Sequence, residues 1–590
     1  MARGVYGNGP SAAAGALHPT SGFHVITTLL GSLRRAAVTI ALIIATLLYL
    51  ALSMNRTVNL TDEGLVLFGA ERVLNGDVPH RDFFTLYGPA QFYLLAALYK
   101  VFGASVLVER AWDTVVRCYC VVLVFIVVKR VAPRKVALLT AAASLVWLAS
   151  FESYGYPVFP ALAAALAGVT FLAPVLARAK PTPRLIVAGV CAGVVVLFRY
   201  DVGFAVFGSE CLILAFAAWT QRSPTTLGLS TAAQCLSLFG AGFALVVTPV
   251  TIAFAVSGAI PDLVFDVVTY SARYYVKMRS LPFPPPWWVW TRPKDLAVYL
   301  PPALCIAAVP TIVDIARRQR TVANVSVNCE RQSAAPIVLK WMLLLLLVLT
   351  LVFFAKGVVR VSRIHMGMAL VGSVALAGVL VQPIRGRGLI GRGMAMAAVL
   401  ATGGFTLLSM GAALKEAVHN IAWASDPASW AEPATEMPPP SGSCRVHPEL
   451  ARLACFHVGP AEIKTILYVE QSSGPDDSVL SGVSRHDRIF VNDVFLYFAA
   501  NRRSVTKWHE YDPGLQTAAV IQEKMVHELQ MAKPKLVVLE ATWENVHEAN
   551  RSALSSGVTI LDDYLSRAYE PVAKFGPNTI LRAKSLEEPS

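Results

Sequence analysis

The amino-acid sequence predicts a polytopic α-helical membrane protein, with about eleven transmembrane helices and a water-soluble α/β domain at its C-terminus. Of its 590 residues, 55% are hydrophobic and only 15% are charged, and the mean hydropathy is +0.54, which leaves too few charges to cover a soluble surface. Apolar runs of about 17–25 residues recur through roughly the first 410 positions, and each can cross about 30 Å of hydrocarbon. Because lipid cannot satisfy backbone polar groups, these runs are predicted to be helices.

The candidate spans follow those apolar runs. They cover residues 36–53, 105–128, 136–150, 156–177, 184–199, 202–220, 231–256, 296–315, 338–355, 366–382 and 393–411. Residues 88–102 are apolar but too short to span a bilayer, so they predict an interfacial or re-entrant helix.

Basic residues gather in alternate connections and set the expected orientation. They precede the first span and follow the second, fourth, sixth, eighth and tenth: Arg34, Arg35, Lys129, Arg130, Arg134, Lys135, Arg178, Lys180, Arg184, Arg222, Arg317, Arg318, Arg320, Arg331, Arg385, Arg387 and Arg392. Cytoplasmic loops carry such an excess, so the N-terminus is expected in the cytoplasm and the C-terminal part outside. The formal charge of +13 therefore indicates topology and contact with membrane lipids, not nucleic-acid binding.

The chain divides into four expected parts. These are a disordered cytoplasmic N-terminus (residues 1–33), a transmembrane domain with a long outer loop at 54–104 (residues 34–411), a linker with a Pro/Ser-rich run (residues 412–443), and an outer α/β domain (residues 444–590). In the last part, strand-like runs at Thr465 to Val469 and Leu536 to Leu539 alternate with helix-like runs at Thr517 to Met531 and Ile560 to Ala568.

The outer domain contains two cysteines, Cys444 and Cys455. A disulfide between them is compatible with an oxidising compartment, although the sequence does not fix the geometry of the pair.

Two adjacent carboxylates, Asp62 and Glu63, follow the first span within the segment Asn59-Leu60-Thr61-Asp62-Glu63-Gly64. A carboxylate at the membrane surface can deprotonate an acceptor hydroxyl or hold a divalent cation. The alternative is a helix N-cap, in which Thr61 or Asp62 caps a helix running on through Ala70 to Leu74. A cap accounts for one of the two acids but not for both.

The stretch from Ala70 to Asp82 resembles the bacterial branch of the GT-C membrane glycosyltransferases, which includes protein O-mannosyltransferases and lipid A aminoarabinose transferases. Members of this superfamily carry an Asp or Asp-Glu pair after the first transmembrane helix, and bacterial members share an A-x-x-hydrophobic-x-x-G-x-hydrophobic-P-x-x-D pattern. The chain departs from the mannosyltransferase-like members at Tyr87-Gly88-Pro89, where they often have His-Pro-Pro. This departure leaves the donor sugar open.

The resemblance implies a donor in which a sugar is linked to a polyprenyl phosphate, and transfer with inversion at the outer face of a bacterial inner membrane. Asp62 matches the catalytic acid of the family and would be the general base, while Glu63 would orient the acceptor or bind metal. Members differ in metal dependence, so a divalent cation (Mg²⁺ or Mn²⁺) is an optional component. Arg72 and Asp82 of the matching stretch, and Tyr87 shortly after it, are assigned to substrate binding.

Cations near the interface would hold the donor phosphate as a leaving group. Two outer clusters are candidates, the first with Arg273, Lys277 and Arg279, and the second with Lys356, Arg360, Arg363 and His365. The alternative is that these residues cap helix ends and meet lipid head groups. Arg199 and Asp201, in a tight outer turn, either pair locally or face substrate.

The sequence thus favours a glycosyltransferase that moves a sugar from a polyprenyl-phosphate donor to a lipid, glycan or protein acceptor. A transporter or flippase of lipid-linked saccharides would be expected to carry its polar residues at the bilayer midplane, and here they gather in outer loops. A non-catalytic scaffold of the same fold stays open as well. The chain contains no metal-ligand spacing, P-loop, Rossmann fingerprint or nucleophile elbow.

Overall fold

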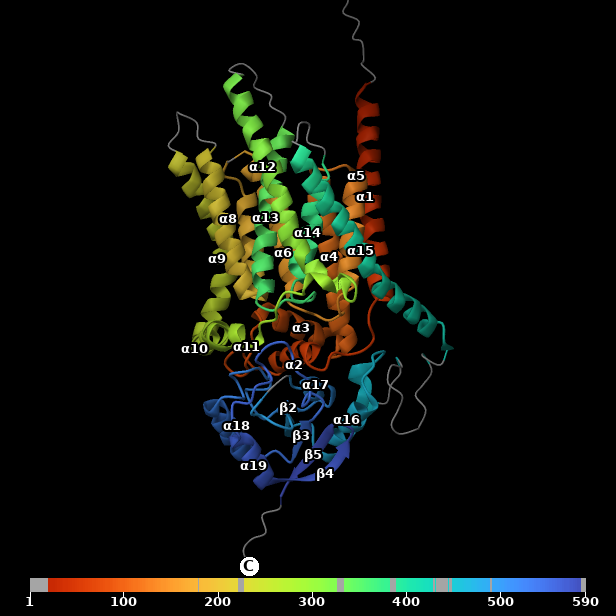
Figure 1. The fold of residues 1–590 in the computed structure, drawn as a ribbon, viewed down its shortest axis with the longest axis vertical. Coiled ribbons are helices and arrows are strands. Elements are labelled where there is room, and N and C mark those ends of the chain that lie inside the picture. Colours follow the sequence, from red (N-terminus) through yellow and green to blue (C-terminus); the bar gives the residue numbers. More distant parts are fainter. Residues whose placement is uncertain are drawn as a thin grey trace, which may run out of the picture.

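The computed structural model describes residues 20–178, 180–220, 228–325, 334–382, 389–427, 430, 444, 448–488 and 491–584. A bundle of long helices occupies one part of the molecule, and a smaller domain with a β-sheet lies against one end of that bundle (Figure 1). This arrangement confirms the predicted fold class, a polytopic helical protein with a C-terminal α/β domain.

Each predicted span lies within one bundle helix or largely overlaps it. The helices are α1 (Thr20–Leu52), α4 (Val106–Lys129), α5 (Arg134–Ala149), α6 (Val158–Leu176), α7 (Arg184–Phe198), α8 (Tyr200–Thr220), α9 (Gly228–Val256), α12 (Leu300–Val325), α13 (Ala334–Val358), α14 (Gly367–Leu380) and α15 (Leu389–Ala424). By length and composition, seven helices in the described residues can cross a membrane, and three shorter apolar helices accompany them.

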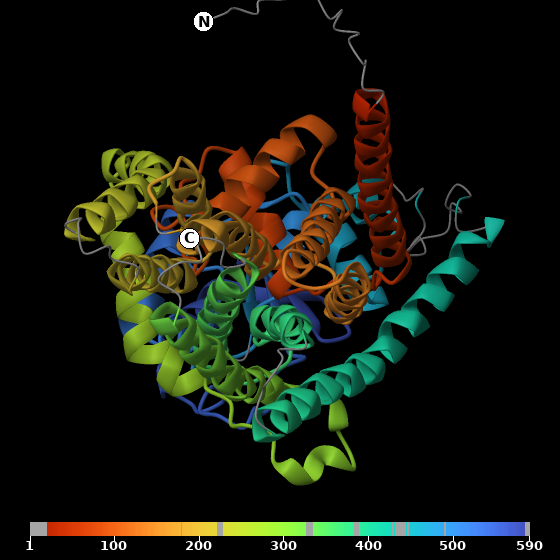
Figure 2. The same ribbon diagram turned by 90° about the horizontal axis from the view of Figure 1, so that it is seen from above.

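Two helices extend further than the sequence predicts. α15 continues to Ala424, past the expected end of the last span at residue 411, and slants along the outside of the bundle as the teal helix of Figure 2. α1 begins at Thr20, within the part expected to be disordered. Residues 1–19 and 431–443 of the expected N-terminal and linker segments lie outside the described residues.

The described helix ends that flank the basic connections lie at one end of the bundle. These helix ends, such as the end of α4 and the start of α5, lie opposite the C-terminal domain (Figure 1). The segregation of Lys129, Arg130, Arg134 and Lys135 from that domain agrees with the alternation of loops that the sequence predicts.

Short helices form a layer between the bundle and the C-terminal domain (Figure 1). They are α2 (Asp62–Leu74), α3 (Pro89–Phe102), α10 (Ile260–Val264), a π-helical turn η1 (Phe265–Tyr275) and α11 (Val276–Arg279), and two 3₁₀ segments follow, η2 (Pro286–Val289) and η3 (Pro293–Tyr299). α3 confirms the helix predicted at 88–102. Gly88 precedes it, and a Cβ there would collide with the carbonyl group of Leu197 at the end of α7.

The C-terminal domain contains a five-stranded sheet in the order β2-β1-β3-β5-β4. The strands are β1 (Ser478–Val483), β2 (Arg503–Ser504), β3 (Leu536–Glu540), β4 (Tyr569–Phe575) and β5 (Asn578–Ala583), with helices η5 (Pro448–Leu453), α16 (Pro460–Ser472), α17 (Phe495–Ala499), α18 (Ala519–Ala532) and α19 (Ile560–Ala568). β1 pairs parallel with both β2 and β3, and β5 pairs antiparallel with β3 and β4. The structure also joins Cys444 and Cys455 in a disulfide.

Three of the four elements predicted for this domain are confirmed, namely β3, α18 and α19. The strand predicted at Thr465 to Val469 is wrong, because these residues lie within α16. Pro460 occupies the start of α16, where its fixed φ favours a helix. Ile463, Ile466 and Leu467 are buried at helical spacing. The burial of one helical face therefore outweighs the β-branched composition that favoured a strand.

The domain docks on the outer loop of the bundle through a shared apolar core. Buried Val66 and Phe68 of α2 belong to the same cluster as Tyr497 and Phe498 of the domain, and the rings of Phe68 and Tyr497 stack at 4.8 Å. The Phe495 N–H donates to the Leu60 carbonyl at 2.9 Å. These contacts fix the acidic motif against the C-terminal domain.

Candidate active site

Asp62 stands at the first turn of α2, between the bundle and the C-terminal domain. The Oδ1 atom of Asn59 accepts hydrogen bonds from the N–H groups of Thr61 (3.1 Å) and Asp62 (2.9 Å). Thr61 stands at the N-cap position, as the sequence allowed, but its side chain forms no capping hydrogen bond, and the Asn59 side chain supplies the acceptor. The half-buried Asp62 carboxylate accepts no hydrogen bond from the residues that the structure describes, which leaves it available to a ligand.

Glu63 has a different environment, since its side chain is fully buried. Its two carboxylate oxygens accept from Nε and Nη2 of Arg110 at 2.5 and 2.8 Å, and Oε2 also accepts from the Asn59 N–H at 2.9 Å. Arg110 reaches the carbonyl groups of Asn55 and Thr57 as well. With its lone pairs engaged by α4 and by the loop before α2, Glu63 holds the acidic motif in place, and its expected role in orienting the acceptor or binding metal stays a prediction.

Four charged side chains from distant parts of the sequence affect the pKa of Asp62. Burial, and next the negative charge of Glu152, raise the pKa of Asp62 to about 6, while the guanidinium groups of Arg279 and Arg360 pull this pKa down. The Asp512 carboxylate raises it. A carboxylate whose pKa lies near neutral pH is suited to accept a proton during catalysis.

Arg279 and Arg360 form a buried ion network with the C-terminal domain. Arg279 pairs with Asp512 at 3.1 Å and with Glu548 at 3.2 Å. Arg360 donates from Nη1 to the same Glu548 carboxylate at 2.8 Å and forms a second, shorter contact with it. The two arginines that the sequence placed in separate cation clusters are thus brought together, and acids of the domain balance their charge.

Lys356 lies at the end of α13 and is half-buried. Its Nζ contacts the Tyr156 hydroxyl and the His365 carbonyl group, each at 3.4 Å, and no carboxylate pairs with it among the described residues. The Tyr156 ring faces this ammonium group at 5.7 Å. The pKa of Tyr156 is raised by burial and also by the negative charge of Asp62, so Tyr156 is close to both groups.

Arg199 and Asp201 form the local pair that the sequence allowed, with Nε–Oδ1 and Nη2–Oδ2 contacts of 3.1 and 2.8 Å. The Arg199 guanidinium also lies 5.7 Å from the ring of Tyr87, which in turn packs edge-on against Tyr156. Next to Lys356, burial holds the pKa of His365 well below its usual range, so its imidazole is neutral. Arg199, Tyr87 and His365 thus border the same region as Lys356.

Arg72 and Asp82 shape the outer loop. Arg72 donates from Nε to Asp77 at 2.6 Å and from Nη2 to the carbonyl group of Asp82 at 2.9 Å. The Asp82 carboxylate accepts from the Val78 N–H at 2.7 Å and pairs with Arg81. Arg72 also donates to the Thr506 carbonyl group of the C-terminal domain at 3.4 Å, so both side chains are engaged by the protein itself, and their assignment to substrate binding stays a prediction.

The remaining predicted cations lie away from this network. Arg273 and Lys277 are exposed on η1 and α11, and neither forms an ion pair within the described ranges. Arg363 lies 3.6 Å from Asp295, measured from Nε to Oδ1. Exposed cations at this end of the bundle fit the alternative interpretation, contact with lipid head groups.

Sequence reasoning missed three acids of the site, Glu152, Asp512 and Glu548. Asp512 precedes Pro513 in a polar loop, and this position alone does not mark it as a site residue. Glu152 and Glu548 have no local motif, and only the tertiary structure places them beside Asp62 and the two arginines.

Two carboxylates at this site, those of Asp62 and Glu152, are candidate ligands for a divalent cation. Glu152 is exposed and uses one oxygen to accept from the Asn59 side chain at 2.9 Å, while Asp62 accepts nothing from the described residues. No group of three or more His, Cys, Asp or Glu side chains in the described ranges has the arrangement of a metal cage. This set suits Mg²⁺, which proteins often hold with one or two carboxylates plus water and substrate phosphate.

Comparison with solved structures finds two of ArnT and one of an archaeal oligosaccharyltransferase. ArnT from Cupriavidus metallidurans bound to undecaprenyl phosphate has a TM-score of 0.52 and 13% identity, over 94% of this chain and 99% of that chain. The apo state of the same ArnT gives a TM-score of 0.53 and 13% identity, over 95% of this chain and 100% of that chain. The archaeal oligosaccharyltransferase AglB from Archaeoglobus fulgidus, in complex with an inhibitory peptide and a dolichol-phosphate, has a TM-score of 0.48 and 11% identity, over 94% and 75% of the two chains.

No protein-family model matches the chain, and no curated protein is similar to it in sequence. The likeness to ArnT extends over nearly the whole length of both chains, so it includes the bundle and the C-terminal domain alike. The fold expected from the sequence resemblance is therefore confirmed.

Proposed function

We propose that this protein is a glycosyltransferase that moves a sugar from a polyprenyl-phosphate donor to a cell-envelope acceptor. The observation that carries the proposal is the Asp62 carboxylate, which is free of hydrogen bonds from the described residues and lies where the outer loop, the bundle and the C-terminal domain meet. The ArnT fold supports the same reaction class, and the structure bound to undecaprenyl phosphate supports a lipid-linked donor.

The site belongs on the outer face of a bacterial inner membrane. The basic connections at the opposite end of the bundle favour the cytoplasm for that end. The Cys444–Cys455 disulfide supports an oxidising compartment for the C-terminal domain.

In the proposed reaction Asp62 is the general base. It removes the proton from an acceptor hydroxyl while that oxygen attacks the anomeric carbon of the donor sugar. The bond between this carbon and the phosphate oxygen breaks, and the polyprenyl phosphate leaves with the electron pair. Attack from the face opposite the phosphate inverts the anomeric configuration. Where a divalent cation takes part, the Asp62 and Glu152 carboxylates would hold it, and it would supply positive charge to the departing phosphate.

Lys356 fits the donor phosphate better than Arg279 and Arg360 do. The two arginines are already neutralised by Asp512 and Glu548. The Lys356 ammonium lies at a helix end at the boundary of the bundle and has no carboxylate partner among the described residues. A half-buried cation without a counter-ion is costly, and an anionic ligand offsets that cost.

A transporter function is supported by one residue only. Glu210 lies in the middle of α8, is buried, and has no hydrogen-bond partner for either carboxylate oxygen within the described residues. The charged groups assigned to the reaction lie at the end of the bundle that meets the C-terminal domain. A single midplane acid does not supply a transport path, so the enzyme is the stronger proposal.

Transfer is expected to rise with pH across the range around pH 6. Below the pKa of Asp62 the carboxyl group is protonated and cannot accept the acceptor proton, and above it the base is present. The Glu152 carboxylate raises this pKa, so Glu152→Gln should shift the rising limb to lower pH. Initial rates from pH 4.5 to 8 measure the rising limb in the wild type and in the variant. If the limb of the variant stays in place or moves to higher pH, Asp62 is not the base.

Lys356→Ala is expected to raise the apparent KM for the donor about tenfold, with a smaller effect on the KM for the acceptor, because it removes one charge-assisted hydrogen bond to phosphate. Lys340→Ala is the matched control, since Lys340 lies on the same helix toward its other end. Steady-state kinetics with the purified protein test the pair. An unchanged donor KM in Lys356→Ala argues against the phosphate contact.

A further inference from the structure

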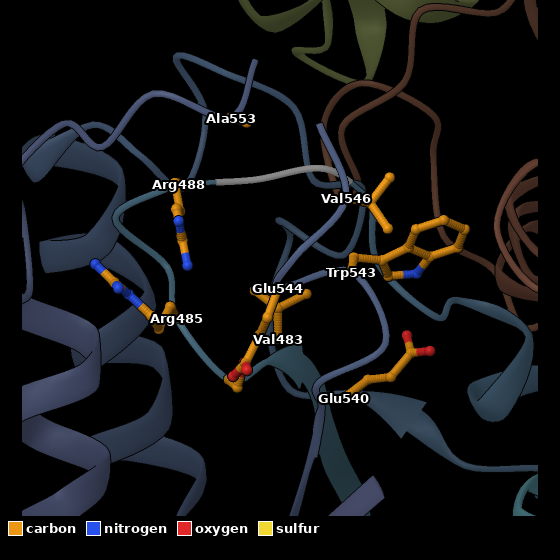
Figure 3. Close-up of a pocket in the computed structure, with 9 residues that line it drawn as sticks. Val483, Arg485, Arg488, Glu540, Trp543, Glu544, Val546 and Ala553 are labelled. Carbon is orange, nitrogen blue, oxygen red and sulfur yellow. The ribbon is translucent and has the colours of Figure 1, made fainter. Parts of the chain in front are cut away.

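A shallow recess opens in the C-terminal domain, and none of the residues that line it is assigned to the reaction. It is lined by Val483, Ser484, Arg485, Arg488, Glu540, Trp543, Glu544, Val546 and Ala553. Figure 3 shows Arg485 and Arg488 on one side and Trp543 and Val546 on the other, with Glu544 between them. The mechanism proposed above uses none of these residues.

The recess lies at the carboxyl ends of two neighbouring parallel strands. Val483 ends β1 and Glu540 ends β3, and the lining continues into the loop that follows each strand. After β1 the chain proceeds to β2 on one side of the sheet, whereas after β3 it proceeds to β4 and β5 on the other side. Such a reversal of strand order leaves a crevice at the ends of the parallel strands, and ligands of open α/β sheets bind in that position.

The lining has the chemistry of a site for a neutral polyhydroxylated ligand. Two guanidinium groups and two carboxylates give it no formal net charge, so a phosphate or another strong anion would meet repulsion from Glu540 and Glu544. Hydroxyl groups can donate to these carboxylates and accept from Arg488, which forms no hydrogen bond or ion pair among the described residues. Trp543 and Val546 provide an apolar wall for the C–H face of a sugar ring.

One loop connects this recess to the reaction centre. Residues 541–559 follow β3 and contribute Trp543, Glu544 and Val546 to the recess. The same loop then carries Glu548, which pairs with Arg279 and Arg360. Those arginines act electrostatically on Asp62, so a ligand in the recess would contact the segment that borders the site of transfer.

We propose that the recess binds one sugar unit of a neutral oligosaccharide acceptor, at a distance from the unit whose hydroxyl reacts at Asp62. The proposal rests on the transferase function and narrows the acceptor to a glycan with more than one sugar unit. The recess then selects acceptors that are long enough to reach it and uncharged. The loop at 541–559 connects the recess to the reaction centre.

An array of neutral and anionic oligosaccharides, probed with the full-length protein in nanodiscs, tests the proposal. The wild type is expected to bind neutral oligosaccharides. Trp543→Ala and Arg488→Gln should each weaken this binding about tenfold or more, because they remove the apolar wall and a charged hydrogen-bond donor. Trp290→Ala and Arg503→Gln are matched controls, since both side chains are well exposed and neither lines the recess.

The outcomes separate the recess from the reaction. Asp62→Asn should keep the neutral-glycan binding of the wild type even though it loses transfer. If the wild type itself binds neutral glycans but transfers no sugar, the recess is supported and the proposed function is contradicted. Glycan binding that survives in both Trp543→Ala and Arg488→Gln overturns the recess as the site. Binding of anionic glycans alone, or of no glycan by the wild type, overturns it as well. Thermal unfolding of each variant shows that a loss of binding does not come from a loss of folded protein.

Discussion

Asp62→Asn is expected to reduce sugar transfer by about 10²- to 10⁴-fold, the range that a positioned general base contributes. The amide has nearly the same shape but cannot accept the acceptor proton. Because the Asp62 carboxylate accepts no hydrogen bond from the described residues, folding and membrane insertion should be unaffected. The assay uses the purified protein with a radiolabelled polyprenyl-phosphate-sugar fraction extracted from the membranes of the source cells.

Asp476→Asn provides the control for this substitution, since Asp476 is 92% exposed on the C-terminal domain and should leave transfer unchanged. A second comparison is Asp62→Glu, which keeps the charge but displaces it and should retain more activity than the amide. If Asp62→Asn transfers sugar at nearly the wild-type rate, the base is a different residue.

The second large effect concerns folding. Arg110→Ala leaves the Glu63 carboxylate buried without its counter-ion, and breaking such a pair costs about 3–5 kcal/mol. The free energy of unfolding should fall by that amount, which is a large share of the stability of a typical domain. Thermal unfolding of the detergent-solubilised protein and the yield of folded material after purification measure this loss.

The matched control is Arg81→Ala, because Arg81 pairs with Asp82 at an exposed position where ion pairs contribute about 0–1 kcal/mol. The double variant Glu63→Gln with Arg110→Gln removes both charges and should recover part of the stability lost in Arg110→Ala. If Arg110→Ala and Arg81→Ala unfold at the same temperature, Glu63 is not held by a buried ion pair.

The fold was largely predictable because its strongest signals are local. Apolar runs such as 338–355 match α13, and alternate basic connections agree with the observed ends of the bundle. The error at Thr465 to Val469 arises because a short run of β-branched and apolar residues fits a buried strand and a buried helix face equally well. The length of α15 was underestimated because its polar last turns lack the hydropathy of a span.

The site was only partly predictable, because it depends on contacts between distant segments. Asp62 was identified from its place after the first span, and the adjacent Glu63 received a catalytic role because the sequence could not show that Arg110 engages it. Arg279 and Arg360 were identified as cations, whereas their common partner Glu548 lies in a loop without a motif. Residues with opposite roles can be neighbours in sequence, and only the fold separates them.

Mass spectrometry of cell-envelope glycans and glycolipids, from a strain that lacks this protein, tests the central claim most directly. The account predicts that one sugar modification disappears, that the wild-type protein restores it, and that Asp62→Asn, expressed at the same level, does not. An envelope with unchanged sugars in the deletion strain, or full restoration by Asp62→Asn, would contradict transfer through this carboxylate.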